Sequence, residues 1–277
     1  MAGCSTQEVE PTNSSINEEI PEMQEDENMT HSSVVGQSSQ FLNTVSSVRN
    51  LEMDIKTREV ENYYQNATGF IARPDDNQSY PGVVLIHEWW GLNDHIKEVA
   101  IAMAQEGYTV FAVDLYNGEI AQESSQAMEL RMGINQTIAN ENMQTALNYL
   151  KDEEEVTQVA SLGFCFGGEQ SAQFSLSEAD LDATVIFYGS VPQNTTSAQG
   201  IDAPVFGVFG EQDSGITPES VNNFEQSLNE LGVENDITIY EGVGHAFVNP
   251  ENEGGYGEEQ MIQAWNSTMN FLNSNLN

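Results

Sequence analysis

The sequence has few basic residues, only two cysteines and no long hydrophobic run. Among 277 residues, 7 Lys and Arg stand against 44 Asp and Glu, and the formal net charge is −37. A surface this negative repels phosphate groups and anionic lipid headgroups, which excludes binding to nucleic acid or to a membrane through a basic patch. No apolar run approaches the roughly 18 residues of a membrane-spanning helix, so we expect no segment to cross a bilayer.

The excess of acids over bases is typical of a protein kept soluble in concentrated salt. At about 1 M salt the Debye length falls to roughly 3 Å, so repulsion among carboxylates is largely screened. We therefore predict a salt-adapted (halophilic) protein that loosens in dilute buffer; the alternative is an acidic protein from an ordinary habitat. Hydrophobic residues make up 39% of the chain and aromatic residues 9%, which is enough to build a core.

Residues 1–48 have the composition of a disordered acidic tail or linker. They are rich in Glu, Ser, Thr, Asn and Gln, and they contain no aromatic residue before Phe41. The opening Met-Ala-Gly-Cys-Ser resembles the end of a lipoprotein signal peptide, where small residues precede a cysteine that becomes lipidated. We expect Cys4 to carry a lipid that anchors an extracytoplasmic protein to the cell membrane; the alternative is a chance cysteine in a disordered leader.

The remaining residues, 49–277, predict one α/β domain, which we expect to be a monomer. Two early segments, 52–63 and 68–73, predict an antiparallel hairpin. Helical stretches fall between the later strands, and a last helix is expected over 258–276. This alternation favours a mostly parallel central sheet flanked by helices. The later strands are expected over residues 82–87, 108–115, 156–163, 183–188, 204–209 and 236–240.

Residues 163–168, Gly-Phe-Cys-Phe-Gly-Gly, have the spacing of a nucleophile elbow with cysteine as the nucleophile. The nucleophile of such an elbow sits on a strained turn between a strand and a helix. The glycines at 163 and 167 are needed because the strand and the helix pass too close for side chains. The dipole of the following helix favours a thiolate at Cys165.

Two later residues have the order and position of the partners that such a nucleophile needs. Asp213 follows the strand at 204–209, and His245 lies in a Gly-rich loop after the strand at 236–240. His245 would take or hold the thiol proton, Asp213 would orient the imidazole and support its charged form, and Cys165 would attack a carbonyl to form an acyl-enzyme. Glu211 is the competing choice for the acid. The backbone N–H of Phe166 would be one donor of the oxyanion hole.

Five segments in chain order resemble the dienelactone hydrolase family, over roughly residues 55–275. They are His-Glu-Trp-Trp-Gly-Leu-Asn at 87–93, Asp-Leu-Tyr at 114–116, the elbow at 163–168, Glu-Gln-Asp at 211–213 and Gly-His-Ala-Phe at 244–247. The resemblance implies an α/β-hydrolase fold with a cysteine nucleophile. It also implies that Glu88 contacts the resting thiol and helps to generate the thiolate, and that Trp89 supplies the second oxyanion N–H.

The resemblance places Tyr188 in the lining of the substrate pocket, although a packed aromatic is an equally good interpretation. Trp90 has the same two interpretations, an apolar wall for the substrate or core packing. We name both as candidate substrate-binding residues. No metal site is predicted, because the histidines and cysteines lack ligand spacing, and no cofactor is expected.

The sequence departs from the family at two positions that bear on the substrate. Family members that act on dienelactones hold the substrate carboxylate with two arginines, and the corresponding positions here are Gly118 and Asn249. Only Arg73 and Arg131 could substitute for them. An uncharged ester, lactone or thioester therefore fits better than a carboxylated lactone. We predict a small-molecule ester or lactone hydrolase; the alternatives are a thioesterase or acyltransferase, or a non-catalytic exported binding lipoprotein on the same fold.

Overall fold

The computed structural model describes residues 40–49, 51, 53–252 and 255–276, all of which belong to one compact unit, Ser32–Asn277. Cys4 and most of the predicted tail lie outside the described residues, so the lipid anchor stays a prediction. Within the described residues, no helix is long and apolar enough to cross a membrane.

Strands and helices alternate over most of the chain. The strands are β1 (Ile55–Tyr64), β2 (Ala67–Pro74), β3 (Gly82–Ile86), β4 (Thr109–Val113), β5 (Val159–Phe164), β6 (Ala183–Phe187), β7 (Val205–Gly210) and β8 (Asn235–Tyr240). The helices are α1 (Gln40–Arg49), α2 (Asp94–Gln105), α3 (Ser124–Met132), α4 (Gln136–Asp152), α5 (Phe166–Ser175), α6 (Thr195–Ala198), α7 (Pro218–Leu231) and α8 (Glu258–Asn275).

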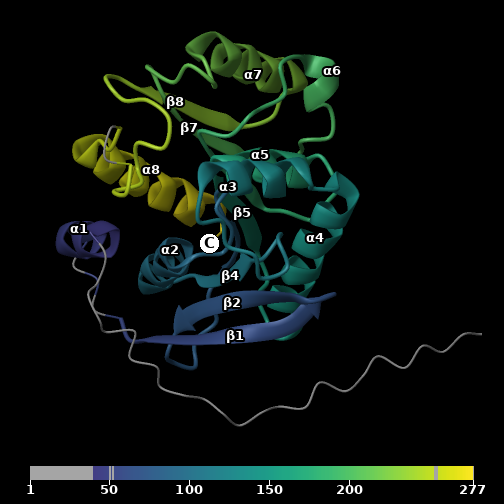
Figure 1. Ribbon diagram of the computed structural model, residues 1–277, viewed down its shortest axis with the longest axis vertical. Helices are drawn as coiled ribbons and strands as arrows, with labels where there is room; N and C mark the ends of the chain where they lie inside the picture. Colours follow the sequence, from purple (N-terminus) through teal and green to yellow (C-terminus); the bar gives the residue numbers. More distant parts are fainter. Residues whose placement is uncertain (1–39, 50, 52, 253–254, 277) are drawn as a thin grey trace, which may run out of the picture. The chain divides into compact units, whose positions relative to one another are not determined.

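The eight strands form one sheet in the order β1-β2-β4-β3-β5-β6-β7-β8 (Figure 1). The pairs β1–β2 and β2–β4 are antiparallel, and every other neighbouring pair is parallel. The predicted hairpin and the mostly parallel α/β sheet are therefore confirmed. Because β3 to β8 run in one direction, the loops after β3, β5, β7 and β8 all lie at the same edge of the sheet.

Helices cover both faces of the sheet (Figure 1). On one face, α1, α2 and α8 enclose a core that includes Phe41, Met103 and Trp265. On the other face, α4 packs on β3 and β4, while α5 and α7 pack farther along the sheet. The inner strands are apolar on both sides, as a parallel sheet between two helical layers requires.

Helix α1 occupies the last part of the segment predicted to be tail. Phe41 and Val45, one helical turn apart, are buried, and the ring of Phe41 meets that of Trp265 at 5.3 Å between centroids. Arg49 at its end pairs with Glu106 at 2.6 Å. The folded part of the chain therefore begins before residue 49. The segment has four apolar residues, of which only Phe41 and Val45 are buried, and ten residues are too short for a clear periodic signal of a helix in the sequence.

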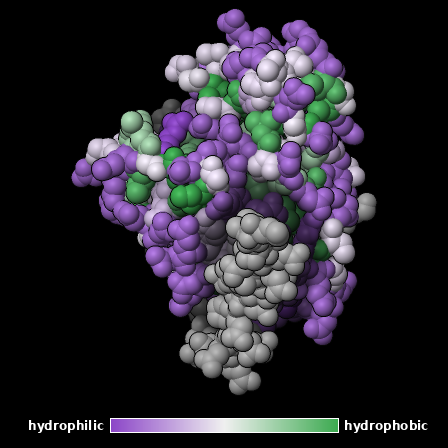
Figure 2. Space-filling model, turned by 90° about the vertical axis from the view of Figure 1, so that its right-hand side faces the viewer, coloured by the Kyte–Doolittle hydropathy of each residue, from purple (hydrophilic) through white to green (hydrophobic). Residues whose placement is uncertain are grey.

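The surface is hydrophilic over most of the face seen in Figure 2, with smaller hydrophobic patches. The few bases are engaged: six of the seven form ion pairs with carboxylates. Two of the six, Arg58 and Arg73, share the single carboxylate of Glu154. With 7 bases against 44 acids, the sequence has too few bases to give each acid a basic partner of its own.

Candidate active site

Cys165 occupies a sharp turn between β5 and α5. Its backbone has φ 54° and ψ −113°, a conformation that residues other than glycine rarely adopt. Its N–H donates to the carbonyl of Phe187 at 2.9 Å. A Cβ at Gly163 would overlap the backbone of Gly167, and a Cβ at Gly167 would overlap the carbonyl of Ile86. The two glycines are thus required by close backbone contacts, and the predicted elbow geometry is present.

The turn brings Cys165 into line with His245 and Asp213. Nε2 of His245 lies 3.1 Å from Sγ of Cys165, and Nδ1 lies 2.7 Å from Oδ2 of Asp213. The other oxygen of Asp213 accepts hydrogen bonds from the backbone N–H groups of Gly215 and Ile216, at 2.8 and 2.9 Å. The three predicted residues therefore meet, from the loops after β5, β7 and β8, in the order that general-base activation of a nucleophile requires.

The competing acid, Glu211, takes a different place. It is exposed, and its carboxylate accepts the N–H of Gly242 at 3.1 Å. Asp213 is buried and meets the imidazole, so geometry favours Asp213 as the acid that orients His245.

The contacts among Asp213, His245 and Cys165 stabilise the charged forms of His245 and Asp213. Burial lowers the pKa of His245, but the hydrogen bonds with Asp213 and Cys165 outweigh it and raise that pKa to about 10. Burial raises the pKa of Asp213, but hydrogen bonds from His245 and from the backbone outweigh it and leave that pKa below its ordinary value. The two hydrogen bonds therefore favour the protonated form of the imidazole, which lies between the Asp213 carboxylate and the sulfur.

Glu88 is buried in the loop after β3, with its carboxylate bound to the side chain of Asn249 at 2.9 Å. Burial raises the pKa of Glu88 to about 7, against the opposing effects of Asn249 and His245. The hydrogen bond of Sγ of Cys165 is made with His245. The contact between Glu88 and the resting thiol that the resemblance implies thus stays a prediction.

His87 fixes the loop that carries Glu88. Its Nδ1–H donates to the carbonyl of Glu88 at 2.6 Å, and its Nε2 accepts the N–H of Leu115 at 3.2 Å. These two partners fit the neutral imidazole, and burial lowers the pKa of His87. The loops after β3 and β4 are therefore joined through one buried ring. Trp89 and Trp90 follow, with ring centroids 5.0 Å apart, and both are partly exposed.

The two predicted oxyanion donors lie at the same edge of the sheet. Phe166 is the first residue of α5, directly after Cys165, and Trp89 follows β3, which pairs with β5. Their assignment as N–H donors to a developing oxyanion remains a prediction.

Tyr188 is a packed aromatic. It is fully buried, and its ring meets the imidazole of His245 at 5.2 Å between centroids. Its hydroxyl has no hydrogen-bond partner among the described residues. Burial, and then the nearby charges of Glu88 and Cys165, raise the pKa of the phenol well above its ordinary value. The phenol therefore lies close enough to Glu88 and Cys165 to be influenced by their charges.

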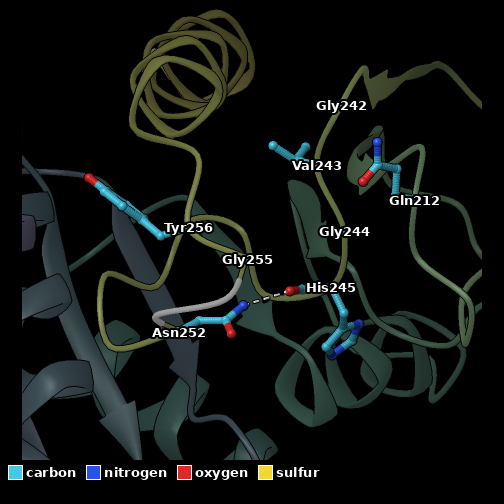
Figure 3. A pocket seen from close by; sticks show the side chains of 8 residues that line it. All are labelled: Gln212, Gly242, Val243, Gly244, His245, Asn252, Gly255 and Tyr256. Atoms are coloured by element: carbon cyan, nitrogen blue, oxygen red, sulfur yellow. Dashed lines mark hydrogen bonds between the residues drawn. The ribbon is translucent and has the colours of Figure 1, made fainter.

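A cavity of about 440 Å³ lies beside the loop that carries His245 (Figure 3). Cys165 is not among the residues that line it, whereas His245, which contacts the sulfur, is. Its lining consists of Gln212, Gly242, Val243, Gly244, His245, Asn252, Gly255 and Tyr256. The side chain of Asn252 donates to the carbonyl of His245 at 2.9 Å and braces this loop (Figure 3).

Two contributors to the site were not identified from sequence: Asn249 as the partner of Glu88, and His87 as the link between loops. Glu88 and Asn249 are 161 positions apart, and no local pattern signals their contact. The part of the chain that the structure describes contains no group of three or more His, Cys, Asp or Glu side chains able to hold a metal ion.

The sheet order, the elbow and the placement of acid and histidine define an α/β hydrolase. The sequence profile of the dienelactone hydrolase family matches residues 67–276. The chain belongs to the dienelactone hydrolase family, and the expected family membership is confirmed.

Relatives and solved structures agree with this assignment. Protein usf of Aquifex pyrophilus is 34% identical over 214 residues, which cover 74% of this chain and 91% of that protein. A protein of Aquifex aeolicus named "Putative carboxymethylenebutenolidase" is 29% identical over 217 residues, which cover 75% of this chain and 93% of that protein. The solved structure of a dienelactone hydrolase-like promiscuous phosphotriesterase from metagenomic libraries matches with a TM-score of 0.74 at 23% identity. The match covers 80% of this chain and 99% of that chain. That structural likeness shows the fold.

Proposed function

We propose that this protein hydrolyses a small, uncharged ester or lactone through an acyl-enzyme on Cys165. The observation that carries the proposal is the continuous line from Sγ of Cys165 through His245 to the buried Asp213. A protein that only binds ligands has no need of a nucleophile in a strained turn with a base beside it.

The reaction would proceed in two stages. The sulfur attacks the carbonyl carbon, and the N–H groups of Phe166 and Trp89 stabilise the oxyanion that develops. The C–O bond to the leaving group breaks as His245 gives that oxygen a proton, which leaves an acyl group on sulfur. His245 then takes a proton from water, and the resulting hydroxide attacks the thioester carbonyl. The C–S bond breaks, the thiolate of Cys165 is restored, and the free acid leaves.

Glu88 would supply the base that generates the thiolate. When its carboxylate takes the proton of the thiol, an O–H bond forms, the S–H bond breaks, and the negative charge moves to sulfur beside protonated His245. A pKa of about 7 suits this step, because the group can hold either state near neutral pH.

The arginines support an uncharged substrate. Arg131 pairs with Glu169 at 2.9 Å, and Arg73 pairs with Glu154. The two candidates for gripping a substrate carboxylate are thus already paired. Asn249, at one of the positions where the family has arginine, is bound to Glu88 instead. A carboxylated lactone would find no free guanidinium from these residues.

We further propose that the protein acts outside the cytoplasm, tethered through Cys4, in a salty medium. The sequence around Cys4 and the net charge of −37 support this, since strong salt screens repulsion among the acids.

Hydrolysis of p-nitrophenyl butyrate in 2 M KCl tests the proposed activity. The wild-type protein and a Cys4→Ser control should release p-nitrophenol at the same rate, whereas Cys165→Ala should fall to the rate of the buffer. Equal rates for Cys165→Ala and the wild type would overturn the proposal. Dienelactone and a matched uncharged lactone, compared in the same medium, test the substrate class.

A further inference from the structure

We propose that Asn249 is a positioning residue that anchors the Glu88 carboxyl group beside His245, so that this buried acid can exchange a proton with Cys165. The inference rests on the proposed function, in which Glu88 generates the thiolate. Both side chains are buried, and Nδ2 of Asn249 donates to Oε2 of Glu88 at 2.9 Å.

The orientation of the Asn249 amide is fixed by a second contact. Its Oδ1 accepts the N–H of Glu251 at 2.9 Å, so the donor end Nδ2 must face Glu88. The backbone N–H of Asn249 donates at 3.1 Å to the carbonyl of Ala246, the residue directly after His245. Asn249 therefore belongs to the turn that carries the catalytic histidine, and it ties that turn to the loop after β3.

Asn249 contributes a hydrogen bond to Glu88 without contributing a charge. The other groups acting on Glu88 and its surroundings are His245, Glu251, Cys165 and the unpartnered hydroxyl of Tyr188. A cation in place of the amide would hold Glu88 ionised, and an apolar side chain would favour its neutral form. The amide leaves both states accessible, which a group that gives and takes a proton requires.

The proton transfer served by this arrangement leaves the total charge unchanged. Ionised Glu88 gains the proton that the thiol of Cys165 loses, and the negative charge moves from carboxylate to sulfur. Asn249 keeps its hydrogen bond to Oε2 throughout, since an amide N–H can donate to a carboxylate or to a carboxylic acid.

The test measures the rate of Cys165 alkylation by iodoacetamide against pH, in a Cys4→Ser background. Asn249→Asp puts a second carboxylate against Glu88, and Asn249→Leu removes the donor; both should retain the proton on Glu88 to higher pH. We expect the midpoint of alkylation to shift by about one pH unit or more in each variant, downward in Asn249→Leu because a neutral Glu88 does not repel the thiolate. Asn222→Asp adds the same charge at an exposed site on α7, and its alkylation rate should depend on pH as that of the Cys4→Ser protein does.

A Glu88→Gln background shows whether the effect passes through Glu88. There, Asn249→Leu should add no further shift, because Glu88, the titrating group on which the amide acts, is gone. An unshifted midpoint in folded Asn249→Asp, or the same shift by Asn249→Leu with and without Glu88, would overturn the proposal. If Asn249→Asp alone unfolds, Glu88→Gln/Asn249→Asp restores an amide opposite a carboxyl group and must recover the melting temperature; failure to recover also overturns it.

Failure of the proposed function would look different. Alkylation of Cys165 would still titrate and respond to Asn249, while the wild-type protein would hydrolyse none of the esters or lactones offered.

Discussion

Nε2 of His245 lies 3.1 Å from Sγ of Cys165, although the two residues are 80 positions apart in the chain. The contact exists because β5 and β8 run in the same direction and end at the same edge of one sheet. Cys165 lies on the strained turn after β5, and His245 lies in the loop after β8 that Asn252 holds through a hydrogen bond. The predictions below test what this pair and its neighbours do.

Replacement of Asp213 by Asn should lower kcat by a factor of about 10² to 10⁴, because the amide cannot hold the protonated imidazole as the carboxylate does. Glu211→Gln is the matched control, since Glu211 lies two residues away and contacts Gly242 instead. Steady-state kinetics with p-nitrophenyl butyrate measure both variants. A larger loss in Glu211→Gln than in Asp213→Asn would show that the acid has been misassigned.

The dependence of kcat/KM on pH should be bell-shaped. Glu88 must lose its proton before it can accept one from the thiol, so activity should rise with an apparent pKa of about 7. His245 must keep its proton to support the thiolate, so activity should fall with an apparent pKa of about 10. In Glu88→Gln the rise near pH 7 should disappear while the alkaline fall remains. A profile of Glu88→Gln identical to that of the wild type would remove Glu88 from the mechanism.

Much of this site could be predicted from sequence because its signals are local. The glycines around Cys165 mark the elbow, and Asp213 and His245 each follow a predicted strand within a few residues. The partner of Glu88 could not be predicted, since Asn249 meets it through tertiary packing of two loops. The buried position of Tyr188 was likewise ambiguous, because an apolar ring with one hydroxyl suits a core as well as a pocket.

The glycine at 163 should be indispensable for folding. Gly163→Ala would place a Cβ against the backbone of Gly167, so the strand or the helix would have to move. We therefore expect the free energy of unfolding to fall by about 3 kcal/mol or more. Gly118→Ala is the control: φ is +86° there, but the space is open, so only backbone strain of about 1 kcal/mol is expected. Urea unfolding of both variants compares them, and equal losses would contradict the close approach.

Stability should increase with salt. Acids outnumber bases 44 to 7, so raising KCl from 0.1 M to 3 M should screen the repulsion among carboxylates and raise the melting temperature. Sucrose of equal osmolality separates screening from general strengthening of apolar burial, and it should raise the melting temperature less. A flat response to KCl would argue for an acidic protein from an ordinary habitat.

The most direct test of the central claim is mass spectrometry of the protein quenched with acid during turnover of p-nitrophenyl acetate. We predict one acetyl group on the peptide that contains Cys165, transient in the wild type and accumulating in His245→Gln loaded at high substrate concentration, because loss of the base slows hydrolysis of the thioester. Turnover by the wild type with unmodified Cys165, or with the acetyl group on another residue, would contradict the account.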